Sequence, residues 1–218
     1  MKNSSGSASS VSDKTRQCII RAAEKIFAQG GYRAMTLRQV TQEAKVNLAA
    51  VNYHFGSKTN LMYALLRERF EPINQQRLTL LDALSEKHAP DPVPLAAIYD
   101  ALFRPLFTGV DSAPVNDTAL MQIIGRALTE PADFMRKLHK EFFADLSQRF
   151  TDEIHRSCPQ LSAEQLQYRF FLSISTMIGT LIEQVRLENI SNGKLDATNL
   201  DKMLHELTAY VVAGFRQE

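Results

Sequence analysis

Residues 36–58 combine two short helical repeats of apolar residues with small, amide-bearing and basic side chains. In the second repeat, Val51 and Phe55 are spaced to anchor one face on a hydrophobic core. The opposite face carries small side chains at Leu48, Ala49, Ala50 and Asn52. A face of this size fits the major groove of DNA, which is about 12 Å wide, where asparagine can pair bidentately with adenine and alanine can meet the thymine methyl group.

Two short helices joined by a three-residue turn are expected to position this face. Thr36 and Gln39 have the capping-box spacing that opens a helix. The turn occupies residues 45–47, and Asn47 is a favourable N-cap for the second helix, which ends at Gly56. This plan is that of a helix-turn-helix.

Charge is distributed unevenly along the 218 residues, whose net charge is only +1. Residues 1–71 carry 11 Lys and Arg against 5 Asp and Glu, a net charge of +6, and the remaining 147 residues carry a net charge of −5. A basic segment joined to an acidic one suits a polyanion-binding domain attached to a domain with a different role.

The rest of the chain reads almost entirely with helical periodicity, so the predicted fold class is all-α. We expect a flexible N-terminal arm over residues 1–12, a three-helix DNA-binding domain with the helix-turn-helix over 13–60, and a helical ligand-binding and dimerisation domain over 61–218. Glycines 30 and 31 should end the first helix, and Pro72 should bend a helix that continues past it. Further helices are predicted near 95–108, 116–129, 132–156, 162–190 and 197–216.

Other classes of protein find little support in the sequence. No Gly-rich phosphate loop, nucleophile elbow or pair of catalytic carboxylates is present, so we do not expect an enzyme or a cofactor. His155 and Cys158 could supply two metal ligands, but no complete set has usable spacing, so no metal is expected. The polar N-terminus does not resemble a secretory signal, and no apolar run is long enough to span a membrane, which predicts a cytoplasmic protein.

The run from Ala44 to Lys58, preceded by Phe27, Gly31-Tyr32 and Thr36-Leu37, closely resembles the N-terminal domain of TetR-family regulators over residues 13–62. The string from Asn47 to Lys58 looks most like a subset that includes fatty-acid-responsive repressors. The resemblance implies a homodimeric, ligand-responsive regulator of transcription that binds double-stranded operator DNA.

The resemblance also implies roles for individual residues. Leu48, Ala49, Ala50 and Asn52 match base-reading positions. Phosphate contacts are implied for Thr36, Arg38, Tyr53, His54 and Lys58, with Arg16 as a lesser candidate. His54 could instead be a half-buried packing residue, and Tyr53 could support the fold while its hydroxyl reaches a phosphate.

The sequence departs from the family at Lys45, where glycine is usual at the start of the turn. If that position requires a positive φ, lysine costs about 1 kcal/mol in backbone strain. It could add a phosphate contact in return, so we include Lys45 among the DNA-binding candidates.

The larger domain is rich in Phe and Met, most of which a helical core would explain. Some could instead line an adaptable apolar pocket. Arg126 lies in an apolar stretch, where it pairs with Glu130, extends toward solvent or meets an anionic ligand head; of these the pairing is favoured. The predicted ligand-binding residues are Phe103, Phe107, Met121, Ile124, Arg126, Phe134, Leu138, Phe142, Met177 and Ile178.

Two long C-terminal segments resemble halves of a four-helix dimer interface, since they join apolar stripes to small residues. The predicted dimerisation residues are Phe170, Ile174, Leu181, Val185, Leu204 and Val211. The favoured function is that of a repressor released from its operator by an amphipathic small molecule, such as a fatty acid or acyl compound. The alternative is a DNA-binding regulator whose second domain only dimerises or recruits a partner, without an effector.

Overall fold

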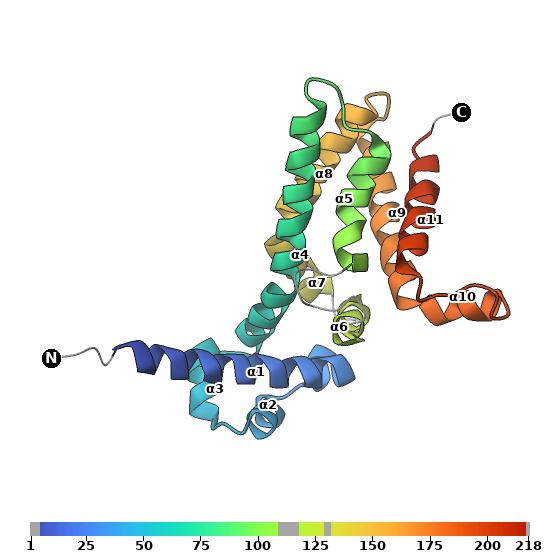
Figure 1. The fold of residues 1–218 in the computed structure, drawn as a ribbon. Helices are drawn as coiled ribbons and strands as arrows, with labels where there is room; N and C mark the ends of the chain where they lie inside the picture. Colours follow the sequence, from blue (N-terminus) through green and yellow to red (C-terminus); the bar gives the residue numbers. More distant parts are fainter. Residues whose placement is uncertain (1–4, 109–117, 129–131, 217–218) are drawn as a thin grey trace. The chain divides into compact units, whose positions relative to one another are not determined.

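The computed structural model describes residues 5–108, 118–128 and 132–216. Within these ranges, only the backbone is described for residues 5–10, 118–119, 126–128, 132–135 and 185. The described residues form helices and connecting segments and contain no strand, which confirms the predicted all-α class (Figure 1). None of the described helices has the length and apolar character needed to cross a bilayer. In chain order they are α1 (Ser5–Ala34), α2 (Leu37–Ala44), α3 (Leu48–Phe55), α4 (Lys58–His88), α5 (Leu95–Thr108), α6 (Thr118–Leu128), α7 (Ala132–Phe142), α8 (Ala144–Ser157), α9 (Ala163–Ile182), α10 (Gln184–Ile190) and α11 (Leu200–Ala213).

The helices group into two compact units, here called the head unit and the body unit. The head unit holds the described parts of residues 1–70 and 118–138, and the body unit those of 71–117 and 139–218. The sequence placed the division after residue 60, whereas the structure adds the first turns of α4, all of α6 and the start of α7 to the head unit. The reason is that α6 packs against α1, a contact between segments distant in sequence.

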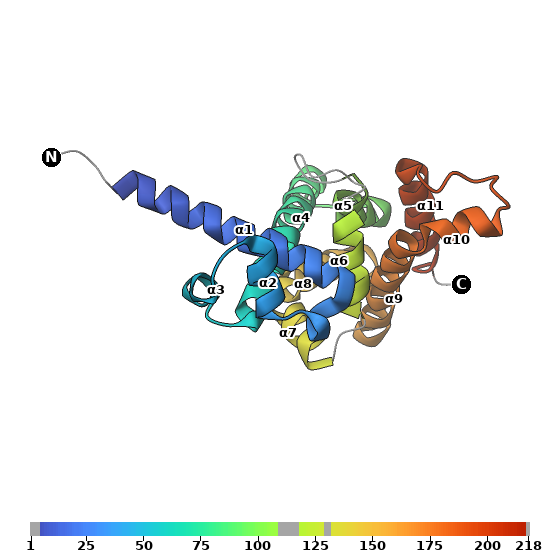
Figure 2. The ribbon, with the colours of Figure 1, turned by 90° about the horizontal axis from the view of Figure 1, so that it is seen from below.

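Helix α1 supplies the core of the head unit, where Ile19, Ala23 and Phe27 are fully buried. It packs against α2 and α3 as well as α6, which Figure 2 shows from below. Gly31 interrupts the helix with φ 74° and ψ 179°, as predicted for the end of this element. The helix begins at Ser5, so residues 5–12 are helical where a flexible arm was predicted. Extending a helix that is already nucleated fixes only one residue per hydrogen bond, and no proline interrupts this segment.

Helix α5 is central to the body unit, where it packs against α8 and α11 (Figure 1). Its inward residues Tyr99, Leu102, Phe103 and Phe107 are all buried. Helix α9 in turn packs against α8 and α11. The predicted helix 162–190 is divided at Glu183, so that α10 is a separate short helix after α9. The predicted helix 132–156 is likewise two helices, α7 and α8.

Candidate nucleic-acid interface

The first motif helix, α2, opens with the predicted capping box. The Gln39 backbone N–H donates to the Thr36 hydroxyl at 3.3 Å, and the Thr36 backbone N–H donates to the Gln39 side-chain oxygen at 2.9 Å. Val40 anchors the helix in the core with no exposed surface. The Thr36 hydroxyl therefore holds the helix start, while Arg38 beside it is exposed.

The turn between α2 and α3 adopts a left-handed residue at Lys45, with φ 55° and ψ 42°. This conformation brings the Val46 N–H to the Thr41 carbonyl at 3.0 Å and so closes the end of α2. Asn47 then caps α3, because its side-chain oxygen accepts from the Ala50 N–H at 2.8 Å. Lys45 therefore has the positive φ under which the sequence analysis attached a strain cost to a lysine at this position.

Helix α3 has two faces of opposite character. Val51 and Phe55 are buried and fix the helix on the head unit. Asn52 is exposed on the other side, and Tyr53 keeps 82% of its surface exposed. Of the remaining predicted base readers, Leu48 and Ala49 are exposed and Ala50 is half-buried. The sequence-predicted set therefore shares the accessible side of one rigid helix.

The residues predicted to contact phosphates differ in burial and in the contacts that they make within the chain. His54 is half-buried, with its ring 5.1 Å from that of Tyr53 in an edge-on arrangement, which is compatible with either of its two predicted roles. The Lys58 ammonium lies 4.3 Å from the Tyr32 ring centroid, a cation–π contact at the start of α4. Tyr32 is in turn held by a hydrogen bond of 2.8 Å between its hydroxyl and that of Thr59.

Arg16 has a structural role that the sequence did not reveal. Its guanidinium forms an ion pair with Glu68 of α4 at 2.7 Å and lies 5.8 Å from the centroid of the Phe55 ring. This arginine therefore connects α1, α4 and α3. Because its guanidinium is engaged in these contacts, it is less available to phosphate than predicted. The missing signal is long-range, since Arg16 and Glu68 are far apart in sequence.

Ion pairs also shape the electrostatics of the head unit. Glu43 pairs with Lys25 at 2.7 Å, and Glu24, which is 8% exposed, pairs with Arg69. With the Glu68 pair, these contacts give three carboxylates of the head unit a basic partner. Helix α3 itself contains no acidic residue. An anion approaching α3 therefore meets backbone N–H groups, basic side chains and no carboxylate on that helix.

The predicted ligand-binding residues are divided between the two units. Phe103, Phe107, Phe142, Met177 and Ile178 belong to the body unit, whereas Met121, Ile124 and Leu138 belong to the head unit. The side chains of Arg126 and Phe134 lie outside the described residues. Phe103, Phe107 and Met177 are at most 3% exposed.

The predicted dimerisation stripe proves to be mainly the inner face of its helices. Leu181, Leu204 and Val211 are at most 6% exposed within a single chain, so they pack in the protomer's own core. Phe170 and Ile174 are half-buried, and the side chain of Val185 is outside the description. Helix α9 has apolar residues on both faces, so periodicity alone does not indicate which face turns inward, and the dimerisation set stays a prediction.

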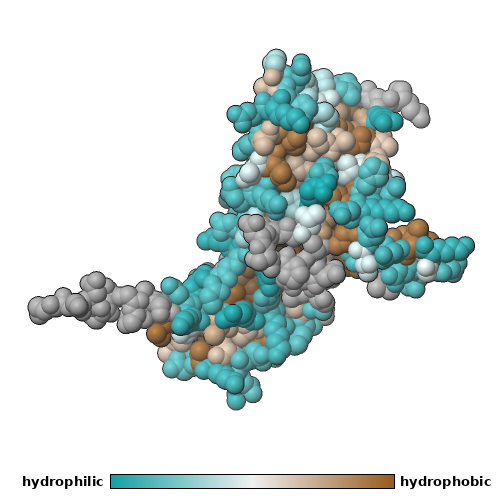
Figure 3. All heavy atoms as spheres, in the orientation of Figure 1, coloured by the Kyte–Doolittle hydropathy of each residue, from teal (hydrophilic) through white to brown (hydrophobic). Residues whose placement is uncertain are grey.

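The accessible apolar residues of α9 and α11 define what we call the outer face of the body unit. Tyr168, Phe171 and Leu172 are 64%, 65% and 57% exposed, and Ile182 and Tyr210 are 40% and 71% exposed. The spacing of the four α9 residues places them on one side of that helix. Hydrophobic surface of this kind is seen where α9, α10 and α11 converge (Figure 3).

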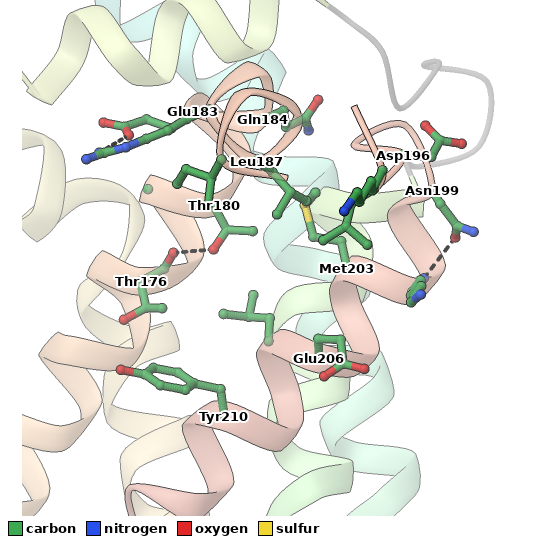
Figure 4. A pocket seen from close by; sticks show the side chains of 17 residues that line it. Thr176, Thr180, Glu183, Gln184, Leu187, Asp196, Asn199, Met203, Glu206 and Tyr210 are labelled. Atoms are coloured by element: carbon green, nitrogen blue, oxygen red, sulfur yellow. Dashed lines mark hydrogen bonds and ion pairs between the residues drawn. The ribbon is translucent and has the colours of Figure 1, made fainter. Parts of the chain in front are cut away.

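A groove of about 600 Å³ adjoins the outer face between α9, α10 and α11. Figure 4 shows Thr180 of α9, Leu187 of α10 and two α11 residues, Met203 and Tyr210, around this hollow. Its rim carries both signs of charge, including Glu206 and the Glu183–Arg186 pair at 2.5 Å. Among the predicted ligand-binding residues whose side chains the structure describes, none lines it.

Arg77 of α4 is a buried cation that the sequence analysis passed over. It is 3% exposed and lies on the same stripe as Ile73 and Leu81, which are also buried. Arg77 is four residues from Ile73 and four from Leu81, so the sequence already placed an arginine in the centre of an apolar helical stripe. That position was the available signal of a buried charge.

Comparisons with known proteins agree with the geometry of both units. Residues 19–65 match the family described as "Bacterial regulatory proteins, tetR family", and residues 100–214, more than half of the chain, match "Tetracyclin repressor-like, C-terminal domain". The chain is 34% identical over 68 residues to the HTH-type transcriptional repressor NicS of Pseudomonas putida, which covers 31% of this chain and 32% of that protein. The chain thus spans about a third of the length of this curated relative.

Solved structures resemble nearly the whole chain. The fatty acid degradation regulator FadR from Bacillus halodurans has a TM-score of 0.63 at 15% identity, covering 94% of this chain and 97% of that one. A chain described as the SmeT–triclosan complex has a TM-score of 0.61 at 16% identity, covering 90% of both chains. At these identities the likeness establishes the fold.

Proposed function

This chain belongs to the TetR family of bacterial regulators, and we propose that it is a homodimeric repressor whose α3 helices read operator DNA. The observation that carries the proposal is the two-sided α3, anchored by Val51 and Phe55 and exposing Asn52 and Tyr53. Because operator DNA lies in the cytoplasm of a bacterium, we assign the protein to that compartment.

Within the interface, Asn52 and the neighbouring Leu48, Ala49 and Ala50 are assigned to base edges. Arg38, Lys45, Tyr53, His54 and Lys58 are assigned to phosphates, which fix the position of α3 without carrying sequence information. The Thr36 hydroxyl and backbone N–H are both engaged in the cap, so the phosphate contact at that position falls to Arg38.

A second copy of the chain is the proposed partner of the outer face. Support comes from five large exposed apolar side chains on α9 and α11, a patch of a kind that single-chain soluble proteins seldom expose. A twofold dimer would present two α3 helices to half-sites about 34–36 Å apart or at multiples of that distance.

The repressor is proposed to leave its operator when an apolar or amphipathic molecule binds the body unit. The neighbour of the same fold described as a triclosan complex supports binding of an apolar effector, and the one described as a fatty acid degradation regulator is in keeping with an acyl compound. The alternative, a body unit that only dimerises or recruits a partner, gains support from the close packing of Phe103, Phe107 and Met177.

Selection from random-sequence duplex DNA tests the proposal. The full chain should enrich inverted repeats whose half-site centres are about 10 base pairs, or a multiple of that spacing, apart. Enrichment of no sequence would contradict DNA reading by α3. Enrichment of a single unrepeated site would contradict reading by a twofold dimer.

A further inference from the structure

Arg77 is the most deeply buried cation among the described residues, and its hydrogen bonds are incomplete. Its Nε donates to the Leu102 carbonyl at 2.7 Å, and one terminal nitrogen donates to the Asn74 side-chain oxygen at 3.2 Å. The other terminal nitrogen meets only the Met177 sulfur, at 4.0 Å. A guanidinium has five N–H donors, so two of them have oxygen acceptors and the others have a weak acceptor or none.

No carboxylate of the described residues pairs with this guanidinium. The contrast with Arg104 of α5 is informative, because that half-exposed arginine makes two contacts with Asp100, at 2.6 and 2.8 Å. Burial lowers the pKa of Arg77 to about 10, which leaves the group charged at neutral pH. A buried charge without a counterion is costly, and proteins normally pair such groups.

The surroundings of Arg77 join polar positioning groups to apolar side chains. The Asn74 amide donates to the Phe142 carbonyl at 2.7 Å, which turns its oxygen toward Arg77. Met177, next to the free end of the guanidinium, is unbranched and can change rotamer to admit a ligand.

We propose that Arg77 binds the carboxylate of an apolar effector, with its terminal N–H groups facing the two carboxylate oxygens. A planar guanidinium matches a carboxylate in this bidentate way, and the pairing supplies the missing counterion. The inference rests on the proposed ligand response and specifies its chemistry. Arg77 lies on α4, whose first turns belong to the head unit, so binding here would act on the helix that follows the reading motif.

The test compares acids with alcohols of the same shape. Dodecanoate and 1-dodecanol form one pair, and 2-naphthoate and 2-naphthalenemethanol form a second, flatter pair. Binding to the full chain is measured by titration calorimetry and by release from the selected operator. For at least one pair the wild-type chain should bind the acid about 10- to 100-fold more tightly than the alcohol, as expected for charge-assisted hydrogen bonds.

Arg77→Met should remove this preference while leaving the alcohol's affinity unchanged, and the matched control Arg104→Met should retain it. Arg77→Lys keeps the charge without the planar fork and should retain part of the preference, which also decides the matter if Arg77→Met does not fold. If Arg77 only supports the Leu102 carbonyl, Arg77→Met will lower the melting temperature and keep the acid preference, which would overturn the proposal.

Different results would overturn the role of Arg77 and the proposed repressor function. Equal binding of acid and alcohol by the wild-type chain would overturn the role of Arg77 and leave a ligand response intact. Binding of none of the four compounds would remove the role of Arg77 as a carboxylate site. Operator binding without any compound, measured on the same samples, reports on the proposed repressor independently.

Discussion

Lys45 holds a left-handed backbone conformation in the turn before α3, and replacing it with glycine should stabilise the protein. Its φ of 55° and ψ of 42° bring its Cβ close to the following carbonyl oxygen, whereas glycine has no Cβ. The lysine side chain is exposed, so the substitution removes no core packing. The backbone bonds that end α2, including that from Val46 to Thr41, remain available to glycine.

The expected gain follows from two opposing terms. An L-residue in this conformation costs about 1–2 kcal/mol. Part of the gain from relieving this strain is lost, because a glycine residue has more conformational freedom in the unfolded chain and folding it costs about 0.5–1 kcal/mol more. The net increase in the free energy of unfolding is therefore about 0.5–1 kcal/mol. For a chain of this size that raises the melting temperature by about 1–4 °C.

Urea unfolding at fixed protein concentration measures the gain, with Asn192→Gly as the matched control. Asn192 has a similar φ of 52° and is also exposed, but asparagine tolerates this conformation better than lysine does. The control should therefore gain less stability than Lys45→Gly does. A Lys45→Gly variant that is no more stable than the wild type, or a gain equalled by Asn192→Gly, would refute the strain argument. The Lys45→Gly variant should also lose a phosphate contact, which would lower the slope of log affinity for DNA against log salt concentration by about one unit.

Three further variants or reagents test other features of the chain. Phe171→Glu, on the outer face, should shift the chain to monomers in analytical ultracentrifugation, whereas Gln75→Glu, exposed on α4, should not. A dimeric Phe171→Glu variant would exclude this face. Lys58→Ala should weaken binding to specific and random DNA alike and lower the salt slope by about one unit, and an unchanged slope would remove Lys58 from the phosphate contacts. A thiol reagent at pH 8 should modify exposed Cys18 rapidly and Cys158 slowly, because burial protects the latter thiol and raises its pKa; equal rates would contradict the packing of α8.

The helix-turn-helix was predictable almost residue by residue because its determinants are local. Caps at Thr36 and Asn47 act within three residues, and a positive φ at Lys45 follows from the family's preference for glycine there. Val51 and Phe55 were assigned to the core by spacing alone, and both are buried. Such features need only the helical period and hydrogen-bond geometry.

Several of the features that the sequence missed depend on contacts between distant segments. The addition of α6 to the head unit and the Arg16–Glu68 pair are examples. On α9, periodicity found an apolar stripe without indicating which of two apolar faces turns inward, and Leu181 of the predicted dimerisation set is buried within the single chain. For Arg77 the signal was present, but an arginine on an apolar stripe does not reveal its partners.

Base reading by α3 can be measured directly with the Asn52→Ala variant. Its affinity is compared with that of the wild type on the selected operator and on random duplex DNA. The exposed side chain of Asn52 makes its removal harmless to the fold, and Gln75→Ala, an exposed amide of α4 in the body unit, is the matched control. Loss of about 1–3 kcal/mol on the operator with little change on random DNA is the predicted result. Equal losses on both, or no loss on the operator, would contradict the assignment of base reading to this face.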